Sequence, residues 1–282
     1  MNSSAFALVL FSAILHASWN FFTKTTTAHR ISMLWFGWLI AGLITFPIAL
    51  ATTDFSTMSL TWLPYIVLTA IVHAVYIYLL GWSYSIGEMS LIYPMARGFG
   101  ILVTLMAVMI LGLDSISPKG FLGICMLSTG ILLVCIKRIR DLEKRVAMKA
   151  ALLVGICVST YSIIDKMSLA HIPPLFYMSV MFITSPLLLT PIMLKRFATQ
   201  TKLVWHKYKV YSTMIGLVSL VTYFLILLAL LDSPTSYVVA LREVSIVFGS
   251  ILGIWLLKEE RNKRKLLGIV IILLGAIVIK TS

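Results

Sequence analysis

Three charged residues lie deep inside long apolar stretches of the sequence: Arg97, Arg242 and Glu243. Each such charge costs roughly 2.5–3.5 kcal/mol at the centre of a membrane helix, so these side chains are expected to face a protein interior or a wet cavity. The planar guanidinium group of arginine binds a carboxylate or a phosphate through two parallel hydrogen bonds. Two arginines against one glutamate leave net positive charge, which predicts a binding site for an anionic group.

A structural role for the same charges is the alternative. Arg242 and Glu243 are neighbours in the sequence and point about 100° apart on a helix, so a direct pair between them is strained. Glu243 would instead reach Arg97 in the other half of the chain and hold the helices together. A third role for Glu243, if it is desolvated, is to bind and release a proton.

Other polar side chains recur at helical spacing on neighbouring apolar stretches. His16 and Asn20 are four residues apart, with Trp19 beside them. Tyr93 lies four residues before Arg97. Taken singly, each such residue is more often an interhelical hydrogen-bond partner, but together they come from six stretches, as a central cavity requires. The predicted substrate-binding residues are Arg97, Arg242, Tyr93, His16, Asn20, Trp19, His73, Tyr161 and Tyr223, and Glu243 is the proton-coupling candidate.

The sequence shows no pattern for metal, nucleotide or enzyme chemistry. His16 and His73 lack carboxylate or histidine partners at metal-ligand spacing. The GFG at 98–100 lies inside an apolar stretch, so it is not a dinucleotide fingerprint. No set of nucleophile and base is visible. We therefore expect no cofactor, no metal ion and no enzymatic activity.

The composition places these residues in membrane helices. Hydrophobic residues make up 60% of the chain and charged residues 12%, whereas a soluble domain carries roughly a quarter charged residues. Apolar stretches long enough to cross a bilayer core of about 30 Å recur throughout. We predict an all-α integral membrane protein with ten transmembrane helices, of which the second, fifth, seventh and tenth are nearly free of polar side chains at mid-depth. The predicted spans are 5–23, 31–50, 62–82, 88–112, 118–137, 148–167, 174–194, 209–231, 234–257 and 264–280.

The second half of the sequence repeats the first after a shift of 145 residues. Landmarks that coincide are Tyr78 with Tyr223, Arg97 with Arg242, Asp114 with Glu259, Gly123 with Gly268, and Gly130 with Gly275. The glycines predict close helix packing, either within the monomer or at a dimer seam. Each repeat, 1–140 and 141–282, holds five helices, and an odd number gives the repeats opposite orientations. This inverted repeat is typical of secondary transporters, which bind substrate near the membrane midplane between the halves.

Lysine and arginine are distributed unevenly between the two predicted sides of the membrane. The loops after the first, third, fifth, seventh and ninth spans hold eighteen of them, and the opposite side holds three. The positive-inside rule then predicts that both termini lie outside the cytoplasm. Loops at an anionic membrane surface explain the net charge of +13 better than nucleic-acid binding does.

The ends of the two repeats resemble a known family. LGLDSISPKGFLGICMLSTG and WLLKEERNKRKLLGIVIILLG each run from a long helix through an acidic residue and a basic residue or stretch to a glycine-spaced helix. With its ten helices in two inverted repeats, essentially the whole chain resembles the EamA-type branch of the drug/metabolite transporter superfamily. LHASWN (15–20), YPMARG (93–98) and ALREVS (240–245) also resemble a subgroup of bacterial permeases, some of which are associated by name with phosphonate use.

This resemblance implies proton-coupled or exchange transport of small metabolites, in a bacterial inner membrane, through a site between the halves. It also implies that Asp114 and Glu259 occupy the family's acidic position, where we expect them to act locally at helix ends. Many members are described with cytoplasmic termini, which is the reverse of the charge count above.

The leading hypothesis is a secondary active transporter for a small metabolite with an anionic group, such as an amino acid, an organic acid or a phosphonate. One alternative is an exporter of hydrophobic cations or drugs that relies on Glu243 and an aromatic wall. Another is a lipid-phosphate flippase. The expected partners are the substrate, membrane lipids, and a proton or an exchanged counter-substrate, with a monomer and a homodimer both open.

Overall fold

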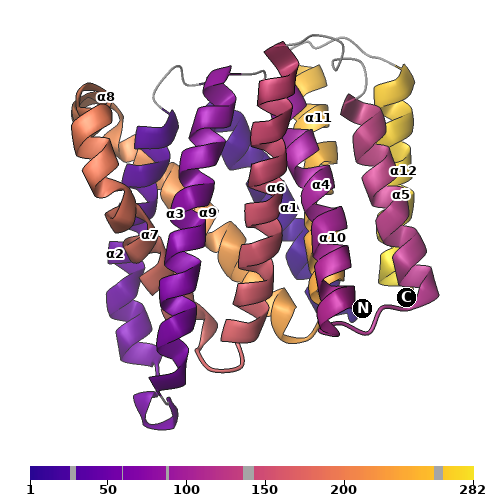
Figure 1. The fold of residues 1–282 in the computed structure, drawn as a ribbon, viewed down its shortest axis with the longest axis horizontal. Helices are drawn as coiled ribbons and strands as arrows, with labels where there is room; N and C mark the ends of the chain where they lie inside the picture. The colour runs from indigo at the N-terminus through magenta and orange to yellow at the C-terminus, as the bar shows by residue number, and fades with distance from the viewer. Residues whose placement is uncertain (26–29, 59, 87–88, 136–142, 257–262) are drawn as a thin grey trace.

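The computed structural model describes residues 1–25, 30–58, 60–86, 89–135, 143–256 and 263–282, and every regular element in these ranges is helical (Figure 1). The helices run side by side and form one bundle. The predicted all-α class is therefore confirmed for the described residues.

The bundle contains long helices from both halves of the chain. In the first half they are α1 (Ser3–Thr25), α2 (Arg30–Thr52), α3 (Leu63–Ile86), α4 (Met89–Leu111) and α5 (Pro118–Cys135), with the short 3₁₀ turns η1 (Phe55–Thr57) and η2 (Leu60–Trp62) between α2 and α3. In the second half they are α6 (Glu143–Ser168), α7 (Pro174–Arg196), α8 (Ala198–Leu203), the π-helical η4 (Val204–Tyr208), α9 (Lys209–Leu231), α10 (Thr235–Arg242), α11 (Ser245–Leu256) and α12 (Lys263–Lys280).

Eight helical stretches in the described ranges are long and apolar enough to cross a membrane. They are α1, α2, α3, α4, α6, α7, the run from α8 to α9, and α10 with most of α11. The two remaining predicted spans are also helices, but the apolar part of α5 is shorter, Pro118–Val134, and α12 begins with the basic sequence Lys263, Arg264, Lys265. The protein is thus a multi-pass membrane protein, and the count of ten crossings stays a prediction.

The predicted span over 234–257 is among the stretches that can cross a membrane, but it is not one continuous helix, because α10 and α11 are separated by a tight turn at Glu243 and Val244. The amide groups of these two residues donate to carbonyl groups three residues back rather than four. A mid-helix 3₁₀ stretch often marks a functional hinge or a sequence under strain. Hydrophobic patterning missed it because the sequence stays apolar on both sides. The turn directs the adjacent Arg242 and Glu243 side chains to different partners in the core.

The start of α10 is held by the loop that precedes α5. The carboxylate of Asp114 accepts hydrogen bonds from the backbone amides of Thr235 and Ser236, at 3.1 and 2.8 Å. These amides have no partner within their own helix, so the acidic side chain caps the helix. The expected local role of Asp114 at a helix end is confirmed, whereas Glu259 lies outside the described residues.

Glycines bring α5 and α12 together along one edge of the bundle (Figure 1). A Cβ atom on Gly130 would lie 2.7 Å from the carbonyl oxygen of Gly268, and one on Gly275 would lie 2.9 Å from that of Gly123. Real Cβ atoms do not approach backbone this closely, so only glycine permits the contact. The small-residue stripe predicted from the sequence is therefore used within the chain.

The two termini lie at the same end of the bundle (Figure 1). The Nζ atom of Lys280 donates to the Oγ atom of Ser3 at 2.8 Å and to the carbonyl oxygen of Met1 at 3.4 Å. An even number of crossings returns the chain to the side on which it started, in agreement with this contact.

We predict that Gly216→Ala destabilises the fold. A Cβ atom on Gly216 in α9 would overlap the backbone carbonyl group of Gly37 in α2. Overpacking of this kind costs about 1–3 kcal/mol, so thermal unfolding in detergent should occur at a lower temperature. Gly249→Ala in α11 is the matched control, because no atom lies within 4 Å of its Cβ position. Equal melting temperatures for the two variants would contradict a backbone contact between α2 and α9.

Candidate functional site

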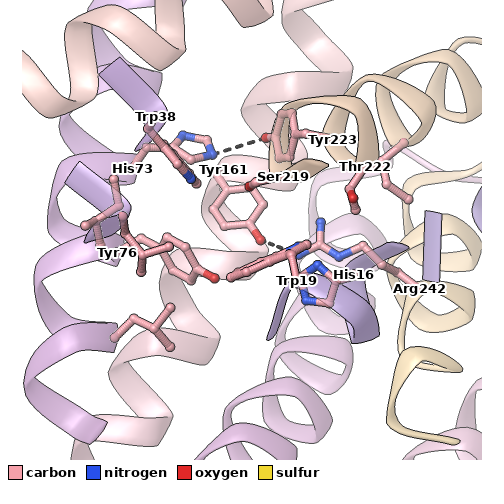
Figure 2. A pocket seen from close by; sticks show the side chains of 14 residues that line it. His16, Trp19, Trp38, His73, Tyr76, Tyr161, Ser219, Thr222, Tyr223 and Arg242 are labelled. Atoms are coloured by element: carbon pink, nitrogen blue, oxygen red, sulfur yellow. Dashed lines mark hydrogen bonds between the residues drawn. The ribbon is translucent and has the colours of Figure 1, made fainter. Parts of the chain in front are cut away.

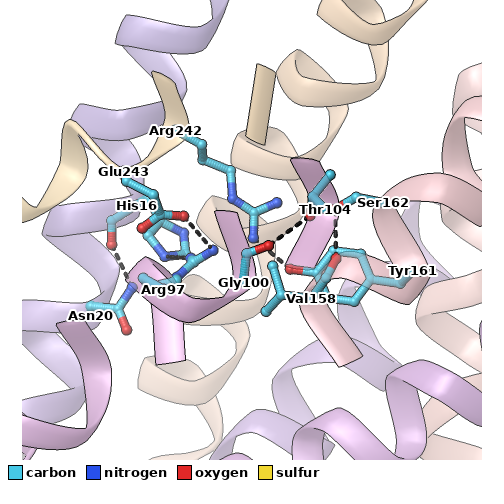
Figure 3. Close-up of polar contacts among 10 residues, drawn as sticks. All are labelled: His16, Asn20, Arg97, Gly100, Thr104, Val158, Tyr161, Ser162, Arg242 and Glu243. Atoms are coloured by element: carbon cyan, nitrogen blue, oxygen red, sulfur yellow. Dashed lines mark hydrogen bonds and ion pairs between the residues drawn. The ribbon is translucent and has the colours of Figure 1, made fainter. Parts of the chain in front are cut away.

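The first cluster of buried charges joins α1, α4 and the turn after α10 (Figure 3). The Nη1 atom of Arg97 lies 3.1 Å from the Oε1 atom of Glu243, and its Nη2 atom lies 2.5 Å from the Nε2 atom of His16. Arg97 is 3% exposed and Glu243 is fully buried. Because a guanidinium group can only donate, His16 accepts through Nε2 and is neutral. The long-range pair between Arg97 and Glu243 considered above is therefore present.

The second cluster is centred on Arg242, at the end of α10. Its Nη2 atom donates to the hydroxyl oxygen of Tyr161 at 2.5 Å, and its guanidinium carbon lies 5.7 Å from the centre of the Tyr161 ring. Two buried polar atoms here, Nε of Arg242 and Oε2 of Glu243, have no hydrogen-bond partner among the described residues. The cluster therefore has unused donor and acceptor capacity in the core of the bundle.

The two clusters have corresponding members in the two halves of the chain. Arg97 bonds to His16 and Arg242 bonds to Tyr161, and both pairs are separated by 81 residues. The shift of 145 residues found in the sequence carries the first pair onto the second. Two side-chain contacts thus share the spacing of the sequence repeat.

A cavity lies against the second cluster (Figure 2). It is lined from α1, α2, α3, α6, α9 and α10, and most of its wall is aromatic or aliphatic. The residues are His16, Trp19, Leu34, Trp38, His73, Tyr76, Ile77, Leu80, Tyr161, Ser219, Thr222, Tyr223, Ile226 and Arg242. Its volume of about 30 Å³ is enough for roughly two water molecules. A metabolite would need the surrounding helices or side chains to move apart.

A third polar network lies behind the cavity wall and contains Asp165 of α6. Its Oδ1 atom accepts from the hydroxyl of Tyr177 at 2.6 Å, and its Oδ2 atom contacts the hydroxyl of Tyr223. The same Tyr223 hydroxyl lies 3.1 Å from the Nε2 atom of His73. On the other side of the His73 ring, Nδ1 lies 3.0 Å from both the hydroxyl and the carbonyl oxygen of Thr69.

Most residues predicted to form a site are gathered around this cavity. Those that line it are His16, Trp19, His73, Tyr161, Tyr223 and Arg242. Arg97 and Glu243 lie behind His16 and do not line the cavity. Asn20 donates to the carbonyl oxygen of His16 at 2.7 Å, so one of its amide hydrogens is used within α1. The side chain of Tyr93 lies outside the described part of the chain.

Sequence reasoning missed the contributions of α2 and α7. The second and seventh spans seemed poor in polar groups, but Trp38 of α2 lines the cavity and Tyr177 of α7 binds Asp165. The indole nitrogen of Trp38 is buried and has no hydrogen-bond partner among the described residues. The sequence does not show that a tryptophan in an apolar stretch lines a cavity, because a tryptophan that only packs against other helices occurs in the same sequence pattern. Within the described ranges, no three His, Cys, Asp or Glu side chains are placed to hold a metal ion.

Comparison with known proteins agrees with this architecture. Residues 145–281 match the EamA-like transporter family, and this confirms the expected resemblance for the second half of the chain. A crystal structure of a protein that is 16% identical covers 100% of this chain and 98% of its own, with a TM-score of 0.79. That similarity shows the fold alone. No protein among those with curated descriptions matches the chain.

We predict that Arg97→Met strongly destabilises the protein, because it leaves the Glu243 carboxylate buried without its ion-pair partner. Breaking a buried pair from one side costs about 3–5 kcal/mol. The double variant Arg97→Met/Glu243→Gln removes both charges and should recover much of that loss. Thermal unfolding in detergent measures both effects.

Arg196→Met is the control for this series, because Arg196 is exposed. In the described part of the chain, its side chain donates one hydrogen bond, to the hydroxyl of Tyr78. If Arg97→Met were as stable as Arg196→Met, the pair with Glu243 would not hold the bundle together.

Proposed function

From the premise that residues 145–281 are an EamA-like transporter segment, we propose that the protein is a secondary active transporter for a small metabolite with an anionic group. The cargo is an amino acid, an organic acid or a phosphonate-like compound, moved by alternating access through the central cavity. Support comes from the cation at the cavity wall, from the aromatic side chains around it, and from the position of the cavity between the halves.

The observation that carries the proposal is the incomplete compensation of Arg242. Its side chain is 5% exposed and lines the cavity, and its Nε atom has no hydrogen-bond partner among the described residues. Its Nη2 atom bonds to a neutral hydroxyl, while Oε1 of the adjacent Glu243 is bound to Arg97. A buried cation without its own carboxylate is costly. A carboxylate or phosphate entering the cavity would compensate it through charge-assisted hydrogen bonds.

The rest of the wall favours a ligand with an apolar or planar body. Trp19, Trp38, Tyr76, Tyr161 and Tyr223 surround the space next to Arg242 (Figure 2). Sites for small molecules are mostly apolar, with a few polar groups that fix the orientation of the ligand. Here Arg242 would hold the anionic group, and the indole nitrogen of Trp38 is a second donor still available.

The proposed mechanism needs two halves that move relative to one another. We place the halves at 1–140 and 141–282, as inverted repeats of five transmembrane helices each. Helix packing supports this assignment: α1 packs on α9 as α6 packs on α3, and α2 packs on α9 as α7 packs on α3. The pairs α2 with α7 and α5 with α12 join equivalent helices of the two repeats. A twofold axis in the membrane plane would relate all these contacts, and the cavity would lie close to it.

The present cavity then corresponds to a closed state. A volume of about 30 Å³ is too small for a metabolite, so loading requires one side of the bundle to open. Inverted repeats allow the two sides to open alternately, because the same contacts exist in both orientations.

We predict that a carboxylate or phosphonate raises the melting temperature of the wild-type protein, and that Arg242→Met abolishes this effect. A ligand that binds only the folded state stabilises it by about 2.7 kcal/mol at a hundred times its dissociation constant. The assay is thermal unfolding in detergent with a panel of amino acids, organic acids, phosphonates and cationic drugs.

The control for this assay is Arg196→Met, which also removes a positive charge but lies at the surface. It should respond to the anion as the wild type does. Stabilisation by cations only, retained in Arg242→Met, would contradict an anion site and favour the export of cations.

We predict that both termini lie on the extracytoplasmic side of a bacterial inner membrane. A periplasm-dependent reporter enzyme, such as alkaline phosphatase, fused after Ser282 should be active, and a fluorescent protein that matures only in the cytoplasm should stay dark in the same position. The opposite pattern would show that the basic residues do not set the orientation, and would give the chain the cytoplasmic termini described for many members of the family.

A further inference from the structure

The carboxyl group of Asp165 has no role in the proposed anion site, although its network shares Tyr223 with the cavity wall. Asp165 is 1% exposed, and both of its oxygen atoms contact tyrosine hydroxyls. One of these tyrosines, Tyr223, also contacts His73, and Tyr223 and His73 both line the cavity. The carboxyl group is therefore sealed from solvent and connected to the cavity by one hydroxyl and one imidazole.

We propose that Asp165, Tyr223 and His73 form a proton-binding site that exchanges with the cavity and couples transport to a proton. This inference rests on the transport function proposed above and names its coupling ion. The proton is taken up from water that enters on one side and is released to water on the other, so no covalent step is involved.

The charges around Asp165 favour reversible protonation of its carboxyl group. The titratable or charged groups that face it are His73 of α3, Tyr177 of α7, Tyr223 of α9 and, farther away, Arg242 of α10. In the part of the chain that the structure describes, Asp165 makes no ion pair. An ionised carboxylate without a counter-ion is expensive to bury, and its neutral acid is much less so.

The neighbouring basic residue on α6 does not compensate Asp165. The Nζ atom of Lys166 donates to the backbone carbonyls of Leu230 and Ser233, at 2.5 and 3.2 Å. Those bonds hold the ammonium group at the end of α9. Neutralisation of Asp165 is therefore left to a proton.

The hydrogen-bond geometry accommodates the network with and without the extra proton. With it, Nδ1 of His73 donates to the carbonyl oxygen of Thr69, Tyr223 donates to Nε2, and Asp165 donates to Tyr223. Without it, Asp165 accepts from Tyr223, Tyr223 accepts from Nε2, and Nδ1 accepts from the hydroxyl of Thr69. The contacts of Tyr223 with Asp165 and with Nε2 persist in both states, while Nδ1 exchanges its bond to the Thr69 carbonyl oxygen for a bond to the Thr69 hydroxyl. This is possible because a hydroxyl can donate or accept and an imidazole has two tautomers.

Glu243 is a poorer proton carrier than Asp165, although the sequence made it the candidate. Its Oε1 atom is bound to Arg97 at 3.1 Å, and Arg242 precedes it in the chain. A proton on Glu243 would leave Arg97 as a buried cation without its partner, and that is costly. A proton on Asp165 neutralises a charge instead of exposing one.

The proton site and the anion site are physically linked through Tyr161. Its ring stacks on the ring of His73 with centroids 4.5 Å apart, and its hydroxyl accepts from Arg242. Tyr161 also lies one helical turn before Asp165 on α6. An anion bound to Arg242 would cancel the positive charge that opposes protonation, so anion and proton should bind together. Binding linkage is reciprocal, so the proton must strengthen anion binding by the same factor.

The repeat supports a single proton site. The position that corresponds to Asp165 after the shift of 145 residues is Asn20, which cannot ionise and bonds to the carbonyl oxygen of His16. The halves therefore share the arginine clusters but differ in the carboxyl group. One titrating carboxyl in one half predicts one proton in each transport cycle.

The first test measures protonation without any substrate, so it is independent of the anion site. Infrared difference spectra of the protein in lipid vesicles are recorded as the pH falls from about 8 to about 5, the range in which imidazole and perturbed groups titrate. The carbonyl band of a buried protonated carboxyl should appear. Asp165→Asn should abolish it, whereas the double variant Arg97→Met/Glu243→Gln and the exposed control Asp232→Asn should keep it.

Asp165→Glu is a second variant for the case in which Asp165→Asn does not fold. It retains a carboxyl group, so the same band should appear at a shifted frequency. Absence of the band in the wild type, persistence in Asp165→Asn, or loss in a folded Arg97→Met/Glu243→Gln variant would each overturn the proton site.

The second test measures linkage with an anion that stabilises the wild type. One linked proton makes the dissociation constant rise up to tenfold for each pH unit above the titration range. Asp165→Asn should still bind the anion, with a dissociation constant independent of pH. An affinity that is independent of pH in the wild type would overturn the coupling. Failure to find any binding anion would instead count against the anion site, while the infrared result would still decide the proton site.

Discussion

The buried ion pair between Arg97 and Glu243 is the interaction on which the rest of the site depends. It joins α4 of the first half to the turn that separates α10 from α11 in the second half. Because Oε1 of Glu243 binds Arg97, the adjacent Arg242 donates to a tyrosine hydroxyl instead, and its side chain lines the cavity. If Glu243 paired with Arg242 instead, the excess positive charge would lie at Arg97, which does not line the cavity, and the cation at the cavity wall would already be compensated. This pairing thus determines which arginine is bound to a carboxylate and which lines the cavity.

Equivalent positions in the two halves have acquired different roles. Arg97 and Arg242 each bond to a partner on the first helix of their own repeat, but one partner is a histidine and the other a tyrosine. Asn20 and Asp165 lie one turn further along the same helices, and only the second can bind and lose a proton. The proposed inverted repeats would supply the twofold frame that alternating access requires. The side chains break that symmetry and make the proposed binding of anion and proton chemically distinct.

Several features of the site could be predicted from the sequence because they follow from the high free energy of placing a charged side chain in lipid. Charges at mid-depth must face inward whatever the packing, so Arg97, Arg242 and Glu243 could be assigned to the interior. The match of Arg97 to Arg242 at one fixed shift indicated that they were equivalent. Trp38 and Tyr177 could not be recognised in this way. Aromatic residues are common in membrane helices, and only their neighbours show whether they face a cavity or a carboxylate.

The sequence by itself determined the all-helical membrane class, most of the spans, the small-residue stripes and the family resemblance. Each of these follows from composition, length and local spacing, which are properties of single helices or of one repeat. Only the tertiary structure decided that Glu243 binds Arg97, that the helix over 234–257 is broken at Glu243, and that Asp165 meets Tyr223 and His73. These contacts join residues between 58 and 150 positions apart in the chain. Such pairings depend on how helices rotate and pack against one another, and the periodicity of one helix does not contain that information.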